Sequence, residues 1–374
     1  MDDAITDDQR MLLDASARLM ADTCPLERIR EKAYADETFA VAYRRQAADL
    51  GWYSMLVPES LGGGTISGNG VLDAALIAYQ RGRLLQPGPF VGTNVVAYAL
   101  AIGGSQEHHG KVLAALMSGE VSASWVVTDS PGAPAMDGVV SATRTAAGYR
   151  LSGDATFVED PGPDGWFLIT AAGADGPGLF LVGRDDPGLR VEPLGSLDIT
   201  RTFLALHLDA LDVPESSLVE NDGSAADLID SLLALACVLM TAESVGAMDH
   251  ELAMTVQYAK DRIAFGRPIG SFQAVKHSLA DTSLLLEMSK AIARAAAQHV
   301  GDGDGYGPQA ASMAKAFVGD CGIDLAQSCF QTFGGIGFTW EHDQHLYLRR
   351  LTSDAAFFGD PVWHREHLCQ LSGI

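Results

Sequence analysis

Residues 227–262 constrain the fold of this chain more than any other segment of its sequence. The segment is typical of one long helix with apolar residues nearly all round, whereas a surface helix keeps one polar face. Such a helix is expected at the centre of a bundle or an oligomer. The other elements must therefore be arranged around it.

The first part of the chain has helical patterns throughout. Thr6-Asp7-Asp8-Gln9 is a capping-box signature, and apolar residues follow it at helical spacing. Further helical patterns, separated by turns rich in Gly and Pro, cover residues 39–50, 72–84, 95–101 and 107–117. We therefore expect an N-terminal helical domain over residues 1–118.

The pattern changes near Gly119. Short segments that alternate or are rich in β-branched residues follow, and Gly, Pro and Asp pairs separate them, which predicts a middle antiparallel β domain over residues 119–222. Helical patterns return over residues 272–299 and 309–331, so residues 223–374 are expected to form a C-terminal helical bundle that carries the oligomer interface. The fold class is thus α+β and multidomain.

The charge balance limits the partners of the chain. Its 25 Lys and Arg residues face 48 Asp and Glu residues, for a formal net charge of −23. This charge argues against nucleic acid and against anionic lipid surfaces as partners. An anionic ligand would have to be held by local Arg side chains, backbone NH groups and helix ends.

The cysteine usage and the apolar runs favour a reduced, cytoplasmic protein. The five cysteines are odd in number, and none forms a C-x-x-C pair or has His at ligand spacing, so no metal site is predicted. Residues 301–307 resemble a calcium loop, but the twelfth position is Met313 rather than the required Glu. Charged residues and Gly break the long apolar stretches, so no membrane span is expected, and the acidic start does not resemble a secretory signal.

Two glycine-rich stretches fail as dinucleotide-binding motifs. Residues 62–68 and 334–337 both miss the G-x-G-x-x-G register. A Rossmann enzyme would also need repeated βα units, which the order of helical, β and helical parts excludes.

Residues 262–277 form the first motif with chemical content. Arg262 offers a planar fork for a diphosphate, Phe265 a flat apolar surface, and Gln273 an amide near a helix N-terminus. Taken alone, the segment is equally compatible with an ordinary turn between two helices.

Residues 331–343, followed by Leu346-Tyr347-Leu348-Arg349-Arg350, form the second motif. The consecutive glycines after a helix allow a ligand to approach the backbone and its NH groups closely, although a glycine helix cap is the common alternative. The two motifs in this order closely resemble the acyl-CoA dehydrogenase family.

A third motif lies in the expected β domain. Residues 125–132 are similar to the family's V-T-E-P-G-x-G-S-D strand, and Leu151-Ser152-Gly153 with Phe157 resembles its N-G-x-K-x-W-I-T strand. The resemblance covers essentially the whole chain. It implies α,β-dehydrogenation of an acyl-CoA thioester to the 2-enoyl-CoA, with FAD as hydride acceptor and an electron-transfer protein as the onward acceptor. It also implies a helical N-terminal domain, a β middle domain, a four-helix C-terminal domain and a tetramer.

The resemblance further implies roles for individual residues. Val127 and Thr128 would touch the isoalloxazine edge, and Phe157 would replace the stacking Trp; we call these three residues the near side. The diphosphate and adenosine of a flavin lying mainly in a neighbouring subunit would be held by a second set, the far side, which comprises Arg262, Phe265, Gln273, Gln331, Gly334 and Gly335.

The catalytic base departs from the family pattern. Ser353-Asp354-Ala355 is followed by residues 357–362 without the expected Glu, and the alternative base position on the long helix is Ala236, followed by Cys237 in place of the usual Arg. Glu243 remains the candidate base. It shares the face of Ala236 about 10 Å further along the helix, where apolar surroundings could raise its pKa. The alternative is a buried structural carboxylate paired with an Arg or a helix end.

Two further positions are altered. Pro134 stands where the family has a substrate-contacting Ser, and Glu159 where it has the Thr that bonds the flavin N5. Two hypotheses follow. The chain forms a self-sufficient homotetramer with Glu243 as base, or it is one subunit of an α2β2 heterotetramer and supplies the diphosphate and adenosine side of its partner's flavin site.

Overall fold

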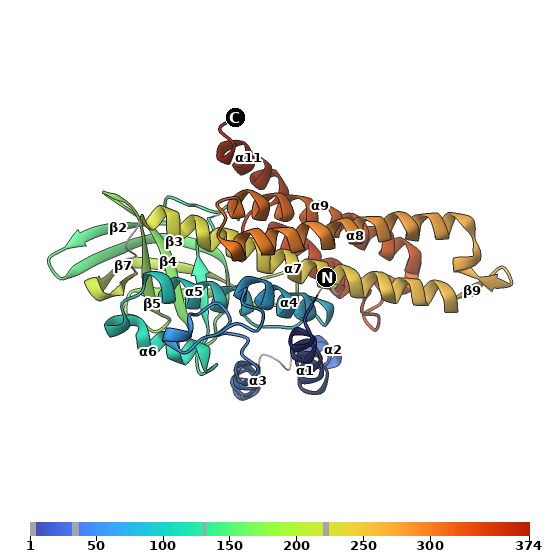
Figure 1. Cartoon of the computed structure of the whole chain (residues 1–374), viewed down its shortest axis with the longest axis horizontal. Helices are drawn as coiled ribbons and strands as arrows, with labels where there is room; N and C mark the ends of the chain where they lie inside the picture. Colours follow the sequence, from blue (N-terminus) through green and yellow to red (C-terminus); the bar gives the residue numbers. More distant parts are fainter. Residues whose placement is uncertain (1–4, 32–36, 130–131, 220–223) are drawn as a thin grey trace.

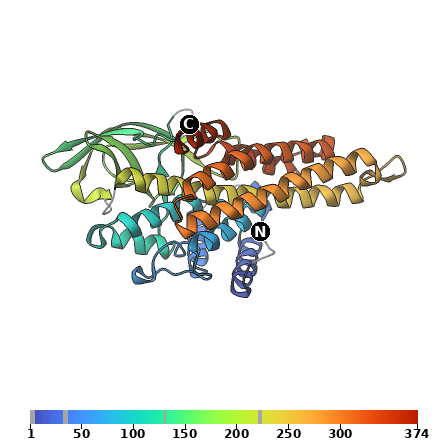
Figure 2. The ribbon, with the colours of Figure 1, turned by 45° about the horizontal axis from the view of Figure 1, so that its top comes forward.

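A computed structural model describes residues 5–31, 37–129, 132–219 and 224–374. The long helix α7 (Ala225–Asp261) runs through the molecule. A β-sheet lies at one end, the helices α8 and α9 extend to the other, and the N-terminal helices cover one flank (Figures 1 and 2). The expected order of helical, β and helical parts is confirmed.

Helix α7 is central because other helices cover it along most of its length. It packs against α4 (Gly70–Arg83), α8 (Gln273–Asp302), α9 (Gly307–Phe333) and α10 (Gln344–Ala356). By length and composition α7 could cross a membrane, but 72% of its apolar window is buried inside the protein, as in a core helix; it is the one such helix in the described ranges.

The crossing of α4 and α7 requires glycine on both helices. A Cβ atom on Gly82 would overlap the carbonyl oxygen of Glu243, and one on Gly246 would overlap that of Tyr79. The two backbones therefore touch directly, and this contact fixes the N-terminal helices on the bundle.

The N-terminal helices begin with the predicted capping box. The Gln9 backbone NH donates to Thr6 Oγ1 at 3.2 Å, and the Thr6 NH donates to Gln9 Oε1 at 3.0 Å. Besides α4, the helices of this part are α1 (Asp7–Thr23), α2 (Leu26–Arg30), α3 (Glu37–Asp49), α5 (Phe90–Gly103) and α6 (Gln106–Met117).

The sheet is mixed rather than purely antiparallel. Strand β4 pairs in parallel with β1 and β2, and the remaining pairs are antiparallel. The sequence analysis expected only antiparallel pairs. Parallel partners are separated by a long connection, and here the β2–β3 hairpin lies between β1 and β4 in the chain, so local patterns do not show the pairing. The strands are β1 (Ala123–Val126), β2 (Val140–Thr145), β3 (Gly148–Glu159), β4 (Trp166–Gly173), β5 (Gly176–Gly183), β6 (Leu189–Leu194), β7 (Phe203–Pro214) and β8 (Leu218–Val219).

The changes between helical and β structure fall close to the expected domain boundaries. Helix α6 ends at Met117 before β1, and β8 ends at Val219 before α7. The division at residues 118/119 and 222/223 lies between these elements and stays a prediction.

The C-terminal helices carry a small hairpin at their far tip. Strands β9 (Ile263–Ala264) and β10 (Arg267–Pro268) join α7 to α8, and this hairpin lies at the opposite end of the molecule from the large sheet (Figure 1). After α9 come a short 3-10 helix (Gly334–Phe338), α10 and α11 (Pro361–Leu371), which projects from the body with the C-terminus.

Candidate functional site

The near-side residues Val127 and Thr128 follow β1. Both are buried, and the Val127 carbonyl accepts a hydrogen bond from the Ala135 NH at 2.7 Å. Thr128 forms an isolated bridge with Pro134, the residue that replaces the family's Ser. Within the described residues the Thr128 hydroxyl makes no hydrogen bond, and the residue is 2% exposed.

Phe157 lies in an aromatic cluster. Its backbone φ is +57°, and its ring stacks on Phe203 at 4.5 Å between centroids, with Phe357 edge-on at 5.2 Å. Phe358 in turn stacks on Phe357 at 4.1 Å and on Trp125 at 6.0 Å. The chain after α10, where the family carries its Glu, thus places two apolar rings against the sheet.

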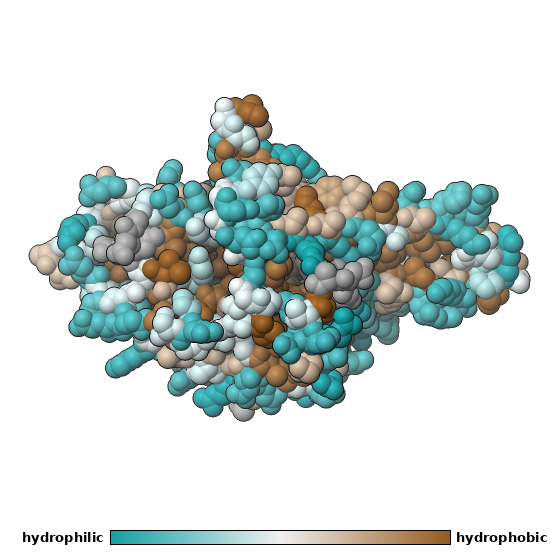
Figure 3. All heavy atoms as spheres, viewed as in Figure 1, coloured by the Kyte–Doolittle hydropathy of each residue, from teal (hydrophilic) through white to brown (hydrophobic). Residues whose placement is uncertain are grey.

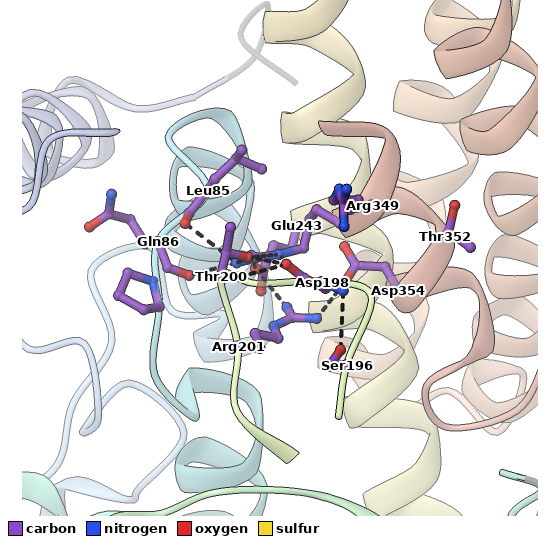
Figure 4. A network of polar contacts seen from close by, with 12 residues as sticks. Leu85, Gln86, Ser196, Asp198, Thr200, Arg201, Glu243, Arg349, Thr352 and Asp354 are labelled. Atoms are coloured by element: carbon purple, nitrogen blue, oxygen red, sulfur yellow. Dashed lines mark hydrogen bonds and ion pairs between the residues drawn. The ribbon is translucent and has the colours of Figure 1, made fainter. Parts of the chain in front are cut away.

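Glu243 lies in a buried ion-pair network (Figure 4). Its Oε1 atom accepts from Arg201 Nη2 at 2.7 Å and also from Arg350 Nη1. Arg201 pairs in addition with Asp354, and Arg350 Nε donates to Asp198 Oδ2 at 3.1 Å. All five side chains are at most 5% exposed.

The charge state of Glu243 follows from these partners. Burial raises the pKa of its carboxyl, but the positive charges of Arg201, Arg350 and Arg81 outweigh burial, so the net pKa is lowered. A general base needs a raised pKa and a free lone pair facing its substrate. The surroundings of Glu243 are those of a structural carboxylate, which was the alternative interpretation of the sequence, and its catalytic role stays a prediction.

The network also joins the three parts of the molecule. Arg201 and Asp198 come from the β6–β7 connection, Glu243 from α7 and Arg350 from α10, and Arg350 Nη2 donates to the Gln86 carbonyl in the N-terminal part at 3.2 Å. Removing one partner of a buried ion pair typically costs about 3–5 kcal/mol. The contacts therefore hold the three parts in register.

Glu159 lies beside the same network. It is 4% exposed, and its Oε1 atom is 3.5 Å from Arg201 Nε. Burial raises its pKa to about 7, against the lowering effect of Arg201. The position that holds a Thr in the family is here a buried acidic group.

The far-side residues at the hairpin are exposed. Arg262 follows the last turn of α7, and its guanidinium forms no ion pair within the described ranges; the neighbouring Asp261 instead accepts from Gln257 at 2.8 Å. Phe265 is 95% exposed, with a backbone φ of +51°. Gln273 begins α8 and is also exposed. The Phe265 ring meets that of Phe272 edge-on, with centroids 6.1 Å apart.

The remaining far-side residues lie at the end of α9. Gln331 is exposed in its last turn, and Gly334 caps the helix with a φ of +60°. A Cβ atom on Gly334 or Gly335 would meet no atom within 4 Å. An open hollow of about 440 Å³ lies between the hairpin and α9, and Phe265, Phe272 and Gln331 are among its lining residues.

The structure therefore separates the two sets. The near side lies by the sheet, after β1 and in β3, and the far side lies at the hairpin and the end of α9, at the other end of the molecule (Figure 1). The sequence interpretation missed the network residues Arg201 and Arg350 and the aromatic cluster. Arg350 stood within the second motif, but its burial was not evident there.

The comparisons with known proteins agree with this architecture. The profile "Acyl-CoA dehydrogenase, N-terminal domain" matches residues 6–120, and "Acyl-CoA dehydrogenase, C-terminal domain" matches residues 226–369. This chain belongs to the acyl-CoA dehydrogenase family. The family consists of flavoprotein oxidoreductases of β-oxidation, and FAD is their cofactor.

Mycobacterial proteins are among the similar relatives. Acyl-CoA dehydrogenase FadE34 of Mycobacterium tuberculosis is 34% identical over 83% of this chain, which spans only 39% of that protein's length. Acyl-CoA dehydrogenase FadE27 of the same organism is 31% identical over 87% of this chain and 86% of its own. The crystal structure of the ChsE4–ChsE5 complex from Mycobacterium tuberculosis is similar with a TM-score of 0.87, at 28% identity over 100% of this chain and 99% of that chain.

Proposed function

We propose that this chain serves α,β-dehydrogenation of an acyl-CoA thioester as one subunit of a mixed α2β2 tetramer. In this assembly it holds the diphosphate and adenosine of an FAD, while a related chain supplies the base. The observation that carries the proposal is the pairing of Glu243 with both Arg201 and Arg350.

The reaction needs a carboxylate that can accept the α-proton of the substrate. Four buried carboxylates lie in this region of the described chain. Glu159, Glu243 and Asp354 form ion pairs with Arg201, and Asp198 pairs with Arg350. Residues 357 and 358 add aromatic rings and no acid. The near side thus offers a ring surface, and each nearby carboxylate is paired with a guanidinium group.

The far side, in contrast, fits the anionic half of the cofactor. Arg262 is exposed and free of ion pairs in the described part, Phe265 presents its ring outward, and the glycines leave open space. A guanidinium binds phosphate through paired charge-assisted hydrogen bonds. Bound FAD would accept the β-hydride of the substrate, and an electron-transfer protein would receive the electrons.

Apolar surface on the bundle supports an oligomer. Leu284 and Met288 on α8 are 60% and 44% exposed, and Met313 on α9 is 40% exposed. Brown patches interrupt the hydrophilic surface over these helices (Figure 3). The similar ChsE4–ChsE5 structure contains two different chains, which supports a mixed assembly here.

A self-sufficient homotetramer is the second candidate. The unbonded Thr128 hydroxyl and the Phe157 ring favour it, because both lie where the resemblance predicts contacts with the isoalloxazine. In this case Glu243 would have to leave its two guanidinium partners to act as base. We propose a cytoplasmic location for either assembly.

Flavin stoichiometry separates the two candidates. The chain is purified alone and after co-expression with a related chain, reconstituted with FAD, and its flavin content is measured by absorbance and native mass spectrometry. Two flavins per mixed tetramer, with none retained by this chain alone, support the half-site role. Four flavins in a homotetramer that oxidises acyl-CoA would overturn it, and loss of that activity in Glu243→Gln would then identify the base.

A further inference from the structure

Glu251 is a buried acid on α7, about two turns beyond Glu243. The side chains of Glu251 and of Gln344, the first residue of α10, are both fully buried. Gln344 Nε2 donates to Glu251 Oε1 and lies 3.5 Å from the Ala326 carbonyl oxygen. Because both of these neighbours are acceptors, this end of the Gln344 amide must be the nitrogen.

Each of these two side chains keeps one oxygen without a hydrogen-bond partner. In the part of the chain that the structure describes, neither Glu251 Oε2 nor Gln344 Oε1 receives a donor. A carboxylate oxygen and an amide oxygen can only accept, so an ionised Glu251 leaves both of them unsatisfied. A protonated Glu251 carries a hydroxyl donor. One proton on Oε2 would therefore supply the donor that both oxygens lack.

The surroundings of Glu251 disfavour its charged form. Cys329 on α9 and Tyr347 on α10 face it, and the pKa of each is raised, first by burial and then by the Glu251 carboxyl. The adjacent His250 stacks on the Tyr347 ring, and burial lowers its pKa. Glu251 forms no ion pair within the described ranges. Burial raises its pKa to about 8, against the lowering effect of the hydrogen bond from Gln344.

We propose that Glu251 is a neutral acid that donates from Oε2 to Gln344 Oε1, so that two hydrogen bonds close an acid–amide ring, and that this ring positions glycines of the far side. The Gln344 side chain supports the 3-10 helix that follows α9, because a Cβ atom on Gly337 would lie 3.5 Å from Gln344 Cγ. Gly334 and Gly335 begin the same short helix. Glu251 is thus a positioning residue for the flavin. This role rests on the proposed function, whereas the ring itself does not.

Ionisation of Glu251 opens the ring. The carboxylate has no proton to give to Gln344 Oε1, and two acceptors then face each other in buried surroundings, where their repulsion is poorly screened. The ring is therefore complete below about pH 8 and is lost as pH rises through that value. Glu251→Gln replaces the acid by an amide, which donates at every pH, so the ring persists in this variant.

The charge state of Glu251 is tested on the full chain without FAD. The infrared difference spectrum at about pH 7, wild type minus Glu251→Gln, should contain the C=O band of a protonated carboxylic acid, because acids common to both proteins cancel. The backbone amides of residues 334–343 should exchange with D2O about 3- to 10-fold faster in the wild type than in Glu251→Gln at about pH 9, the equivalent of one neutral hydrogen bond, and equally fast at about pH 7. A difference spectrum without the band would overturn the ring.

FAD binding tests the positioning role. Between the same two pH values the FAD dissociation constant of the assembled protein should rise about 3- to 10-fold more in the wild type than in Glu251→Gln. Asp227→Asn, which changes an exposed carboxylate in the first turn of α7, is the control and should keep the wild-type pH profile. Coinciding profiles of the wild type and Glu251→Gln, for FAD binding and for amide exchange, would show that Glu251 does not position the segment.

A second variant replaces Glu251→Gln if that protein does not fold. Gln344→Leu can form neither bond of the ring, so its amides 334–343 should exchange faster than those of Asp227→Asn at about pH 7 and equally fast at about pH 9. A slow exchange in Gln344→Leu at about pH 7 would overturn the ring. If the assembled wild type binds no FAD at either pH, the half-site role fails instead, and the infrared band and the amide exchange still decide the ring.

Discussion

The two ends of this molecule differ in whether their polar and aromatic side chains are buried and paired within the chain. At the sheet end, carboxylates and guanidinium groups are buried and paired with one another, and the aromatic rings stack within the chain. At the hairpin end, Arg262 is exposed and has no ion pair in the described residues, and the Phe265 ring is 95% exposed although its edge meets Phe272. Residues satisfied inside the chain serve its stability, and residues left open are available to another molecule. We therefore propose the tip as the part of this chain that binds the cofactor.

The largest effect is expected at the sheet end. Arg350→Ala leaves the buried Asp198 without its ion-pair partner and Glu243 with Arg201 alone, so the free energy of unfolding should fall by about 3–5 kcal/mol. The neighbouring Arg349 makes one hydrogen bond, to the Leu197 carbonyl at 2.9 Å, and Arg349→Ala is the matched control. Urea unfolding measures both. Equal losses in the two variants would mean that the network contributes little.

The next effect concerns the tip. Arg262→Ala should weaken FAD binding to the assembled protein by about 1.5–3 kcal/mol, the range for a hydrogen bond to a charged group, with the helical content unchanged. Arg267 on the same hairpin is the control, since its guanidinium lies over the Phe272 ring at 4.1 Å. FAD titration of apo-protein measures the dissociation constants. An unchanged constant for Arg262→Ala would remove this residue from the site.

A comparison within α7 predicts opposite pH dependences. Burial raises the pKa of Glu251 to about 8, an effect that the hydrogen bond from Gln344 offsets only in part, whereas the arginines lower that of Glu243. The folded state therefore holds the Glu251 proton more tightly than the unfolded state. This contribution to stability is lost as pH rises from about 4.5 to about 8. The Glu243 contribution is instead lost as pH falls below its usual range.

Glu251→Gln removes the first of these contributions. In the wild type the free energy of unfolding falls as pH rises through that window. In Glu251→Gln this fall should be smaller by at least about 1.4 kcal/mol, the equivalent of one pKa unit. Urea unfolding at pH values below and above the window measures it. If the free energies of unfolding of the wild type and the variant differ by the same amount at every pH, Glu251 does not titrate in that window.

The smallest effect on the fold is expected at Gly335. Its Cβ would meet open space, so Gly335→Ala should change the free energy of unfolding by no more than about 0.5 kcal/mol. If a flavin from a neighbouring subunit occupies that space, FAD binding should weaken while the melting temperature stays the same. Unchanged FAD binding would place the flavin elsewhere on the tip.

Local patterns predicted much of this architecture. The capping box at Thr6, the central position of α7 and the change to β structure after residue 118 all follow from composition and spacing. The residues of the tip could also be identified from the sequence, because their motif is contiguous. The family resemblance supplied the reaction and the cofactor.

The partners of Glu243 could not be predicted in the same way. Arg201 and Arg350 are separated from it by 42 and 107 residues, and a single sequence does not show which distant charges meet. The same limit hid the parallel strands beside β4 and the rings that stack on Phe157. A residue's charge was visible in the sequence, but whether it was neutralised depended on the fold.

The charge network has a further consequence for how the molecule comes apart. Because the β6–β7 connection, α7 and α10 share the same two guanidinium groups, none of these three can detach without stranding charge in the others, and detachment of the N-terminal part would cost Arg350 its hydrogen bond to the Gln86 carbonyl. Opening of the sheet alone is therefore penalised by the loss of these buried ion pairs. The subunit should lose its structure in one cooperative transition, with a single heat-absorption peak rather than a separate peak for each domain.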